Sequence, residues 1–334
     1  MKKVFIIFGV VFCLFLAAAI LFYFHLARYA ETPAPGAPVE LMLVISPGQD
    51  LRSISESLQR GGIIVSRLKF EWLCRLRGYE KQLKAGEYLF SSAMTPTKIL
   101  DILTRGQVYL HRLTVPEGYN LLQIAAAVAR AGLAAETDFI AAAAHPALLR
   151  QSGVTGEKFE GYLFPDTYYF PKGVSAQKMI STMVRRFWSV WTPELKKRAE
   201  QIGFSIHQAV TLASIIEKET AVPAERPLVS SVFHNRLKKG IRLESDPTVI
   251  YGIENFDGNI TRKHLLQPTN YNTYRIKGLP PGPIASPGKD AITAALFPAD
   301  TSFYYFVAKK DKTHKFSTTH AEHKLAVGKY QLSR

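Results

Sequence analysis

The sequence predicts an α+β protein with one N-terminal transmembrane helix, a small α/β module and a larger mixed α/β domain. Three observations lead to this prediction: a long uncharged apolar run opens the chain, a strand-turn-helix pattern then occurs twice, and apolar helical stretches afterwards alternate with loops rich in Pro and Gly. At about 150 residues per domain, the 334 residues allow one to three domains. We expect an anchor over residues 1–30, a linker over 31–40, the module over 41–150 and the main domain over 151–334.

The apolar run from Val4 to Phe24 contains no charged residue. About 20 such residues cross the hydrocarbon core of a bilayer. Lys2 and Lys3 precede the run, so the positive-inside rule predicts a single-pass protein of the cytoplasmic (inner) membrane with a cytoplasmic N-terminus and an extracytoplasmic main domain. A cleaved signal peptide is the alternative, with residues 17–19 as its cleavage site, but the run is longer than a usual signal core. The Pro-rich segment Thr32–Pro38 is predicted to be a semi-rigid spacer that holds the rest off the membrane.

The charge balance indicates an anionic partner. Lys and Arg number 42 against 27 acidic residues, for a net charge of +15. We expect no nucleic-acid partner, because the sequence has no RNP-type motif, paired zinc-ligand cysteines or Gly-Lys-Ser/Thr loop. The two cysteines, Cys13 and Cys74, give neither a disulfide scaffold nor a Cys-based zinc site. His320 and His323 have a metal-compatible spacing but no evident third ligand, so we expect no metal and no cofactor.

The module contains two copies of one unit. A strand at Leu41–Ser46 leads through a Pro-Gly turn to a helix capped by Asp50. Four residues of this unit recur later at a constant offset: Gly48, Leu51, Ile54 and Leu58 match Gly118, Leu121, Ile124 and Val128. Strand-helix-helix-strand modules with a Gly turn resemble LysM-type glycan-binding folds. A generic α/β module without a ligand explains the pattern equally well.

The stretch Gln208–Tyr251 holds the main catalytic candidates. Its first helix is apolar and ends with Glu217 and Glu219. A carboxylate at the end of an apolar helix is costly unless it is paired or used. The two are about 200° apart around the helix, so they cannot share a face. Each borders the apolar stripe on its own side, so spacing does not choose between them, and a plain surface role is open for either.

Further candidates lie in loops and turns. An aromatic segment, Phe159–Phe170, carries Glu160 and Asp166, and it is either a buried strand and turn or the wall of a cleft. Rigid loops with aromatic and amide groups suit polyhydroxylated ligands, because binding costs them little entropy. The alternative is a set of structural turns, including an Asx turn at Asp246. The other candidates in such positions are Asp246, Thr248, Tyr271, Asn272 and Tyr274, and Asn235 is a further candidate on the predicted helix Leu228–Lys238.

Six motifs occur in order along the chain: EGYLFPDTY at 160–168, ASIIEKET at 213–220, VFHNRL at 232–237, SDPTVIYG at 245–252, YNTY at 271–274 and GLPPGPI at 278–284. In these motifs the sequence resembles the endolytic murein transglycosylase (YceG-like) family. Ile241 departs from the pattern, which favours Met, and the last hairpin turn lacks the usual Gly. The resemblance implies a membrane anchor, a LysM-like module and an α/β catalytic domain. It also implies that the catalytic acid is the first Glu of ASIIEKET, Glu217.

The resemblance implies a lytic transglycosylase that needs no cofactor. Glu217 would protonate the glycosidic oxygen between N-acetylmuramic acid and N-acetylglucosamine, then accept the proton of the muramoyl 6-hydroxyl, giving a 1,6-anhydro end. Apolar neighbours are expected to raise the pKa of this Glu toward roughly 6. The loop candidates would contact the glycan or stabilise its charge. The implied partners are peptidoglycan strands, the membrane and peptidoglycan synthases, with a role in ending strand elongation.

Two other interpretations stay open at this point. A hydrolytic muramidase would leave reducing ends instead of anhydro ends. A non-catalytic wall-binding or division scaffold would rely on the LysM-like module and would tolerate the loss of Glu217.

Overall fold

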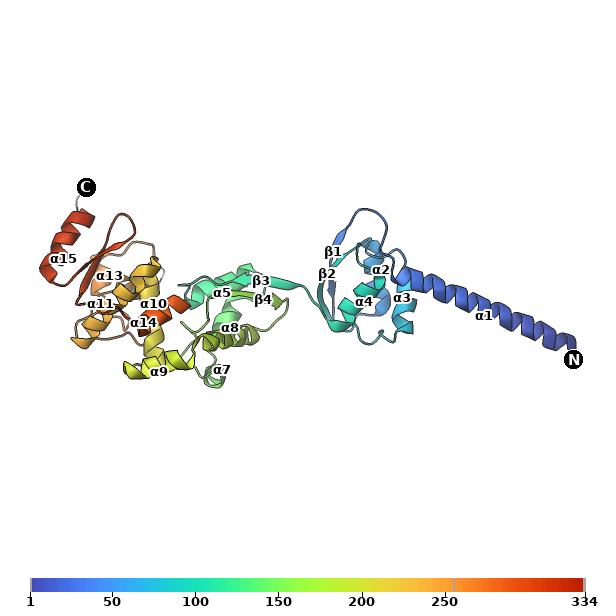
Figure 1. The fold of residues 1–334 in the computed structure, drawn as a ribbon, viewed down its shortest axis with the longest axis horizontal. Helices are drawn as coiled ribbons and strands as arrows, with labels where there is room; N and C mark the ends of the chain where they lie inside the picture. Colours follow the sequence, from blue (N-terminus) through green and yellow to red (C-terminus); the bar gives the residue numbers. More distant parts are fainter. Residues whose placement is uncertain (1, 255, 333–334) are drawn as a thin grey trace. The chain divides into compact units, whose positions relative to one another are not determined.

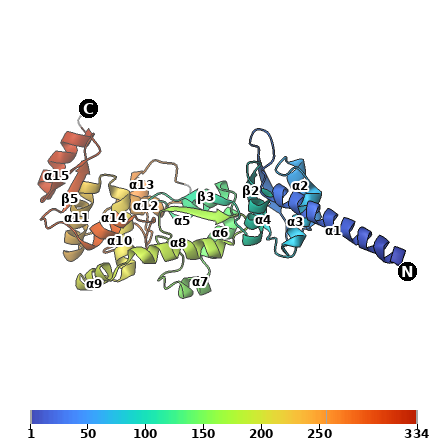
Figure 2. The ribbon, with the colours of Figure 1, turned by 45° about the vertical axis from the view of Figure 1, so that its right-hand side comes forward.

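The computed structural model describes residues 2–254 and 256–332 and divides into two compact units, Met1–His111 and Arg112–Arg334. Each unit has its own hydrophobic core. The elements of both are labelled in Figure 1, and Figure 2 shows them from a second direction. The observed division lies well before residue 150, where the sequence predicted the module to end.

The first unit begins with α1 (Lys2–Ala30), whose segment Phe5–Ala30 is long and apolar enough to cross a membrane. It continues with β1 (Glu40–Ile45), α2 (Leu51–Arg60), α3 (Arg67–Leu76), β2 (Gly86–Ser91) and α4 (Pro96–Arg105). The strands β1 and β2 pair antiparallel, with Glu40 opposite Ser91. This is the predicted strand-helix-helix-strand order, while the likeness to LysM folds stays a prediction.

The last turn of α1 belongs to the core of the first unit. Leu26, Tyr29 and Ala30 are buried there together with residues of α2, α3 and both strands. The Pro-rich segment after it is also held in place, because Ala34 N–H donates to Ser92 O (3.1 Å) and Val39 N–H donates to Ser92 Oγ (2.8 Å). The segment therefore runs against the unit instead of separating α1 from it, unlike the predicted spacer.

The repeated strand-turn-helix unit is confirmed. Its second copy consists of β3 (Leu110–Thr114) and α5 (Leu121–Arg130). Both turns use a glycine with positive φ, 80° at Gly48 and 75° at Gly118, a conformation that a side chain disfavours. Both helices are capped by a short polar residue, Asp50 or Asn120. The second copy nevertheless belongs to the second unit, because β3 pairs with β4 (Thr167–Pro171) and α5 packs on α6 (Glu136–Ala143).

The second unit is mainly helical around a long buried helix, α10 (Ile206–Glu219), which packs against α11 (Arg226–Lys238) and α14 (Lys289–Leu296). The predicted closing hairpin is present as β5 (Tyr305–Ala308) and β6 (His314–Ser317), followed by α15 (His320–Val327) and a π-helical turn, Gly328–Leu332. The remaining helices are α7 (Pro146–Gln151), α8 (Ala176–Val190), α9 (Pro193–Gln201), α12 (Asp246–Tyr251) and α13 (Arg262–Leu266).

Candidate active site

The two glutamates of α10 occupy its last turn, as predicted. The helix starts with a capping box between Ser205 and Gln208, and its residues from Ala209 to Ile216 are all buried in the core. Thr220 is extended and Pro223 follows, so the helix cannot continue. Glu217 and Glu219 leave this turn on different sides and meet different surroundings.

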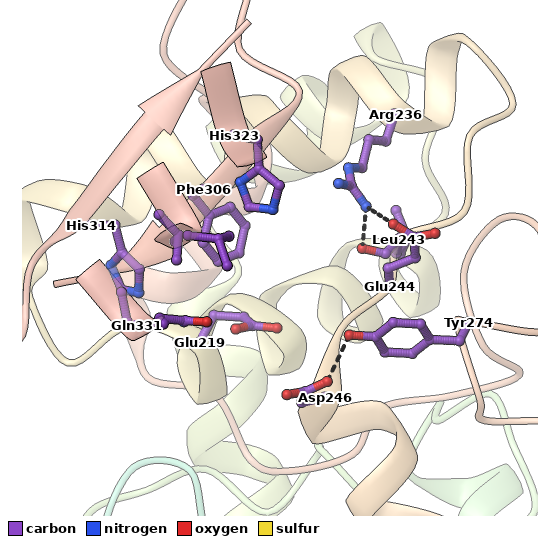
Figure 3. A pocket seen from close by; sticks show the side chains of 13 residues that line it. Glu219, Arg236, Leu243, Glu244, Asp246, Tyr274, Phe306, His314, His323 and Gln331 are labelled. Atoms are coloured by element: carbon purple, nitrogen blue, oxygen red, sulfur yellow. Dashed lines mark hydrogen bonds and ion pairs between the residues drawn. The ribbon is translucent and has the colours of Figure 1, made fainter. Parts of the chain in front are cut away.

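Glu219 borders a cavity of about 420 Å3 (Figure 3). Segments far apart in the sequence form its walls: the end of α10, the loop before α12, Tyr274, β5 and α15. Six charged or titratable side chains other than Glu219 line it: Arg236, Glu244, Asp246, Tyr274, His314 and His323. The cavity is thus a polar site assembled around one carboxyl group.

The surroundings of Glu219 favour its protonated form. Burial raises its pKa to about 7, and the nearby Asp246 carboxylate also raises it. Two groups oppose this by favouring the charged form: the Ser245 hydroxyl, which donates to Glu219 Oε1 (2.5 Å), and the more distant Arg236. This raised pKa makes the protonated form of Glu219 accessible near neutral pH, and a general acid needs that form.

A buried network holds Ser245 toward Glu219. Ser245 N–H donates to Thr273 Oγ1 (2.9 Å), and the Thr248 hydroxyl donates to Ser245 O (2.6 Å). The two threonine hydroxyls lie 2.8 Å apart, and both residues are fully buried. The threonines of the SDPTVIYG and YNTY motifs therefore position Ser245, and Thr248 does not reach the cavity as a glycan contact would.

The loop preceding Ser245 is fastened by Arg236. Its guanidinium donates to Leu243 O (2.9 Å), to Glu244 Oε2 (3.1 Å) and to Tyr304 O (2.7 Å), which joins the loop to β5. Glu244 adopts a φ of 52°, a left-handed conformation that costs free energy in a residue with a side chain. Strained residues of this kind cluster at functional sites, and this one lies in the cavity wall.

Glu217, the acid that the resemblance implies, lies in a buried ion-pair cluster and is absent from the cavity lining. Its carboxylate accepts from Arg226 (2.9 Å) and from Gly288 N–H (2.9 Å), and its side chain is 6% exposed. Arg226 also pairs with Glu117 (3.5 Å) and Asp290 (3.6 Å). Burial raises the pKa of Glu217, against the Gly288 N–H and the Arg226 charge, which favour the carboxylate.

Asp246 and Tyr274 are the predicted binding residues that line the cavity, and the Tyr274 hydroxyl donates to Asp246 Oδ1 (2.7 Å; Figure 3). Asn235 and Asn272 instead hold the backbone. The Asn235 amide donates to Thr301 O and Phe303 O (2.9 Å each), and the buried Asn272 amide donates to three carbonyls, of which Gln267 O is the nearest (2.7 Å).

Three more predicted residues lie outside the cavity lining. Glu160 is buried, and it accepts from Leu121 N–H (3.0 Å) at the start of α5 and from the Tyr251 hydroxyl (3.0 Å). Burial raises the pKa of Glu160 to about 7. Tyr271 packs on the Tyr251 ring at 4.8 Å between centroids. Asp166 pairs with Arg186 (2.7 Å), and this hydrogen bond is the main reason that the Asp166 pKa is lowered.

Sequence reasoning missed most of the cavity wall. Arg236 belongs to the VFHNRL motif, directly after Asn235. The two side chains differ in role, because Asn235 only holds the backbone, whereas Arg236 also lines the cavity. His323 was noted only as half of a metal-compatible pair, yet it stacks on Tyr305 (5.2 Å), and its buried Nδ1 has no hydrogen-bond partner among the described residues. Throughout the described residues there is no group of three side chains suited to a metal ion. Phe306 and His314 belong to the YFVA and H-x-F-S segments of the family pattern, but nothing local marks them as cavity residues, because the fold brings them there from β5 and β6.

Comparison with known proteins shows the family. The model of the YceG-like family matches residues 43–329. An endolytic murein transglycosylase of Bacillus subtilis is 34% identical over 87% of this chain and 84% of its own length. A protein of the same name from Streptococcus pneumoniae is 30% identical over 92% of this chain, which matches 61% of that longer protein. The crystal structure of a yceG-like protein from Listeria monocytogenes is 31% identical, with a TM-score of 0.61 over 87% of this chain and all of that one. The chain belongs to the YceG-like family.

Proposed function

We propose that this protein is a membrane-anchored lytic transglycosylase that cuts peptidoglycan glycan strands, and that Glu219 is its catalytic acid. The single observation that carries the assignment is the position of the Glu219 carboxyl group at the wall of a polar cavity. Its pKa is raised to about 7, and a buried hydroxyl network holds Ser245 against it. The family membership and the names of the bacterial relatives support peptidoglycan as the substrate.

Protonated Glu219 starts the reaction by donating its proton to the glycosidic oxygen that joins N-acetylmuramic acid to N-acetylglucosamine. The bond from the muramoyl anomeric carbon to that oxygen breaks, and positive charge develops on the sugar ring. The Glu219 carboxylate then removes the proton from the muramoyl 6-hydroxyl, whose oxygen bonds to the anomeric carbon. The products are a 1,6-anhydro end and a free hydroxyl on the leaving sugar. Glu219 regains its proton, and no water or cofactor is consumed.

The choice of Glu219 over Glu217 rests on what each carboxyl group already does. Glu217 uses one oxygen for Arg226 and the other for Gly288, so proton transfer to a substrate would require breaking a buried ion pair. Among the residues that the structure describes, Glu219 is engaged by a single hydroxyl, that of Ser245, and it borders open volume. That hydroxyl stabilises the carboxylate left after the first proton transfer.

The other cavity residues take supporting roles in this proposal. Asp246, whose side chain accepts from the Tyr274 hydroxyl, stabilises positive charge on the sugar ring. Tyr274 and Phe306 offer ring faces to the sugar, and Arg236 keeps the strained Glu244 loop in place. Asn235, Thr248 and Asn272 shape the site from behind it, through the backbone contacts described above.

The N-terminal helix is the proposed anchor. Cleavage after residue 19 would leave an exposed apolar stub, Ile20–Phe24, ahead of a buried last turn, which favours an uncleaved helix. With Lys2 and Lys3 on the cytoplasmic side, the chain after α1 lies outside the cell membrane. An enzyme held there cuts strands close to where they are made and, together with peptidoglycan synthases, ends their elongation. The surplus of positive charge suits an anionic wall and anionic lipids.

The products of purified murein sacculi test the reaction class. The full-length protein in detergent is incubated with sacculi, and the released fragments are identified by mass spectrometry. We expect anhydro-muramoyl ends, each lighter than a reducing end by one water. Reducing ends would instead show hydrolysis, the second candidate, which gains support from Asp246 as a second carboxylate at the same cavity. Binding without release would leave the scaffold interpretation.

A further inference from the structure

The outer face of α3 is an exposed apolar stripe. Leu68, Trp72 and Leu76 follow one another at four-residue spacing, so they lie on one side of the helix. They are 59%, 49% and 61% exposed. The opposite side, with Phe70 and Cys74, is buried in the core of the first unit. Large apolar side chains gathered on one exposed helix face mark an interaction surface.

Contacts with α1 fix the direction in which this stripe faces. Near the start of α3, the Tyr29 hydroxyl donates to Ser66 O (3.1 Å), and just past its end Arg77 pairs with Glu31 (3.9 Å). Both ends of α3 are thus tied to the end of α1, so α3 crosses α1 there. Between them, the Trp72 ring contacts the Phe22 ring edge-on, with 5.9 Å between centroids. The stripe therefore faces back along α1, toward its apolar part.

The depth of this contact matches the boundary of a membrane. Phe22 lies two residues before the end of the uncharged run at Phe24, a rise of about 3 Å along the helix. Trp72 is thus level with the outer limit of the segment that would span the hydrocarbon core. Tryptophan prefers this depth, because its ring is apolar while its N–H needs a polar partner.

Basic side chains surround the same end of α1. A cavity of about 350 Å3 beside α3 is lined by His25, Arg28, Tyr29 and Lys69, among others. The Lys69 ammonium lies 5.7 Å from the centre of the Tyr29 ring. Apolar side chains on one side with cations beside them are typical of helices that lie in the interface of an anionic bilayer. The cations suit lipid phosphates.

We propose that α3 is an interfacial membrane helix whose stripe, Leu68, Trp72 and Leu76, lies in the outer leaflet around α1. This inference rests on the proposed anchoring by α1. The occupant of the stripe is the bilayer itself, because the surface is continuous with the membrane-spanning helix through Phe22 and Trp72. The first unit then rests on the membrane, and its distance from the bilayer is fixed by α3 instead of by the Pro-rich segment.

Trp72 is one of three tryptophans, and the other two, Trp188 and Trp191, lie in the second unit, so its fluorescence tests the proposal. The full-length protein is reconstituted in vesicles of phosphatidylcholine and phosphatidylglycerol, with or without bromine on the acyl chains. Bromine quenches only tryptophans that it contacts. We expect brominated lipid to reduce the emission of the wild type and of the control Trp188→Phe, and to leave that of Trp72→Phe unchanged.

Flotation of each sample with the vesicles separates two kinds of failure. If the protein floats but brominated lipid does not quench it, the interfacial helix is overturned and the anchor stays intact. The same holds if the protein floats and the quenching persists in Trp72→Phe. Quenching of the Trp72 component by iodide in the water also overturns it. A protein that does not float overturns the anchor and this proposal together. Phe at position 72 keeps an apolar ring against Phe22, so the variant is expected to fold.

Discussion

Glu217 and Glu219 lie about half a turn apart on α10, so they meet different surroundings. Helical geometry alone places Glu217 and Glu219 on different sides of α10, and the structure agrees. Helical geometry does not tell which of the two glutamates borders a cavity. The rest of the cavity wall comes from residues 243–246, Tyr274, β5 and α15, which are far from α10 in the sequence. The resemblance implies Glu217 as the acid, and this stays a prediction. We propose Glu219 instead, because Glu217 is already paired with Arg226.

The pKa of Glu219 predicts the pH dependence of the reaction. The free enzyme needs the protonated acid, so kcat/KM should fall as the pH rises through about 7. The Ser245 hydroxyl favours the carboxylate, so Ser245→Ala should raise the pKa and move this decline to higher pH. Rates of glycan release from pH 5 to pH 9 measure both effects. A decline that stays in place after Ser245→Ala would contradict the assignment of Glu219.

The ion pair between Arg226 and Glu217 predicts that replacing Arg226 lowers the stability of the second unit. Arg226→Met would leave the buried Glu217 carboxylate unpaired, which costs about 3–5 kcal/mol of the free energy of unfolding. Asp290→Asn is the matched control in the same cluster. Its side chain is 72% exposed and should change stability by less than about 0.5 kcal/mol. Urea unfolding followed by tryptophan fluorescence measures both, and equal losses would contradict the cluster's role.

At the scale of elements, the motifs correctly marked the segments that build the site, but not the task of each residue. In YNTY, Asn272 and Thr273 turn inward to hold the loop, while Tyr274 reaches the cavity and Tyr271 packs on Tyr251. Such loops have no fixed period like a helix or strand, so the direction of each side chain depends on tertiary contacts. The capped helices and the closing hairpin, by contrast, were predictable from local signals such as Asp50.

The hydrogen bonds of Asn272 predict the result of removing its amide. Asn272→Ala leaves the carbonyls of residues 264, 265 and 267 without this donor, at a cost of about 1–3 kcal/mol. The loss should appear in the free energy of unfolding and only slightly in KM, because the amide does not contact the cavity. The exposed Asn259→Ala is the control and should leave stability nearly unchanged. A large rise in KM with unchanged stability would restore Asn272 as a glycan contact.

For the whole molecule, composition and the apolar run led to the α+β class and the N-terminal helix, and the constant offset led to the repeat. The boundary between units was not predictable in this way. The second copy, with Leu121 and Ile124, has the same local pattern as the first, but its apolar stripe packs in the larger core. The core in which the apolar stripe of α5 packs depends on tertiary partners such as α6 and β4, which local sequence patterns do not identify.

Separate cores predict separate stability. Phe90 is fully buried in the first unit, so Phe90→Ala should cost that unit about 3–5 kcal/mol. Hydrogen exchange read by mass spectrometry should show faster exchange in peptides of residues 26–111, and unchanged exchange in α10 and α14. Faster exchange throughout the second unit as well would show that the two cores unfold as one.

The most direct test of the central claim compares Glu219→Gln with Glu217→Gln in the full-length protein. Each variant is incubated with murein sacculi, anhydro ends are counted by mass spectrometry, and the unfolding temperature is recorded in parallel. We expect Glu219→Gln to stay folded and lose at least about 10²-fold in rate. Glu217→Gln should unfold at a lower temperature and retain activity where it is folded. Full activity of Glu219→Gln, or a folded but inactive Glu217→Gln, would contradict the account.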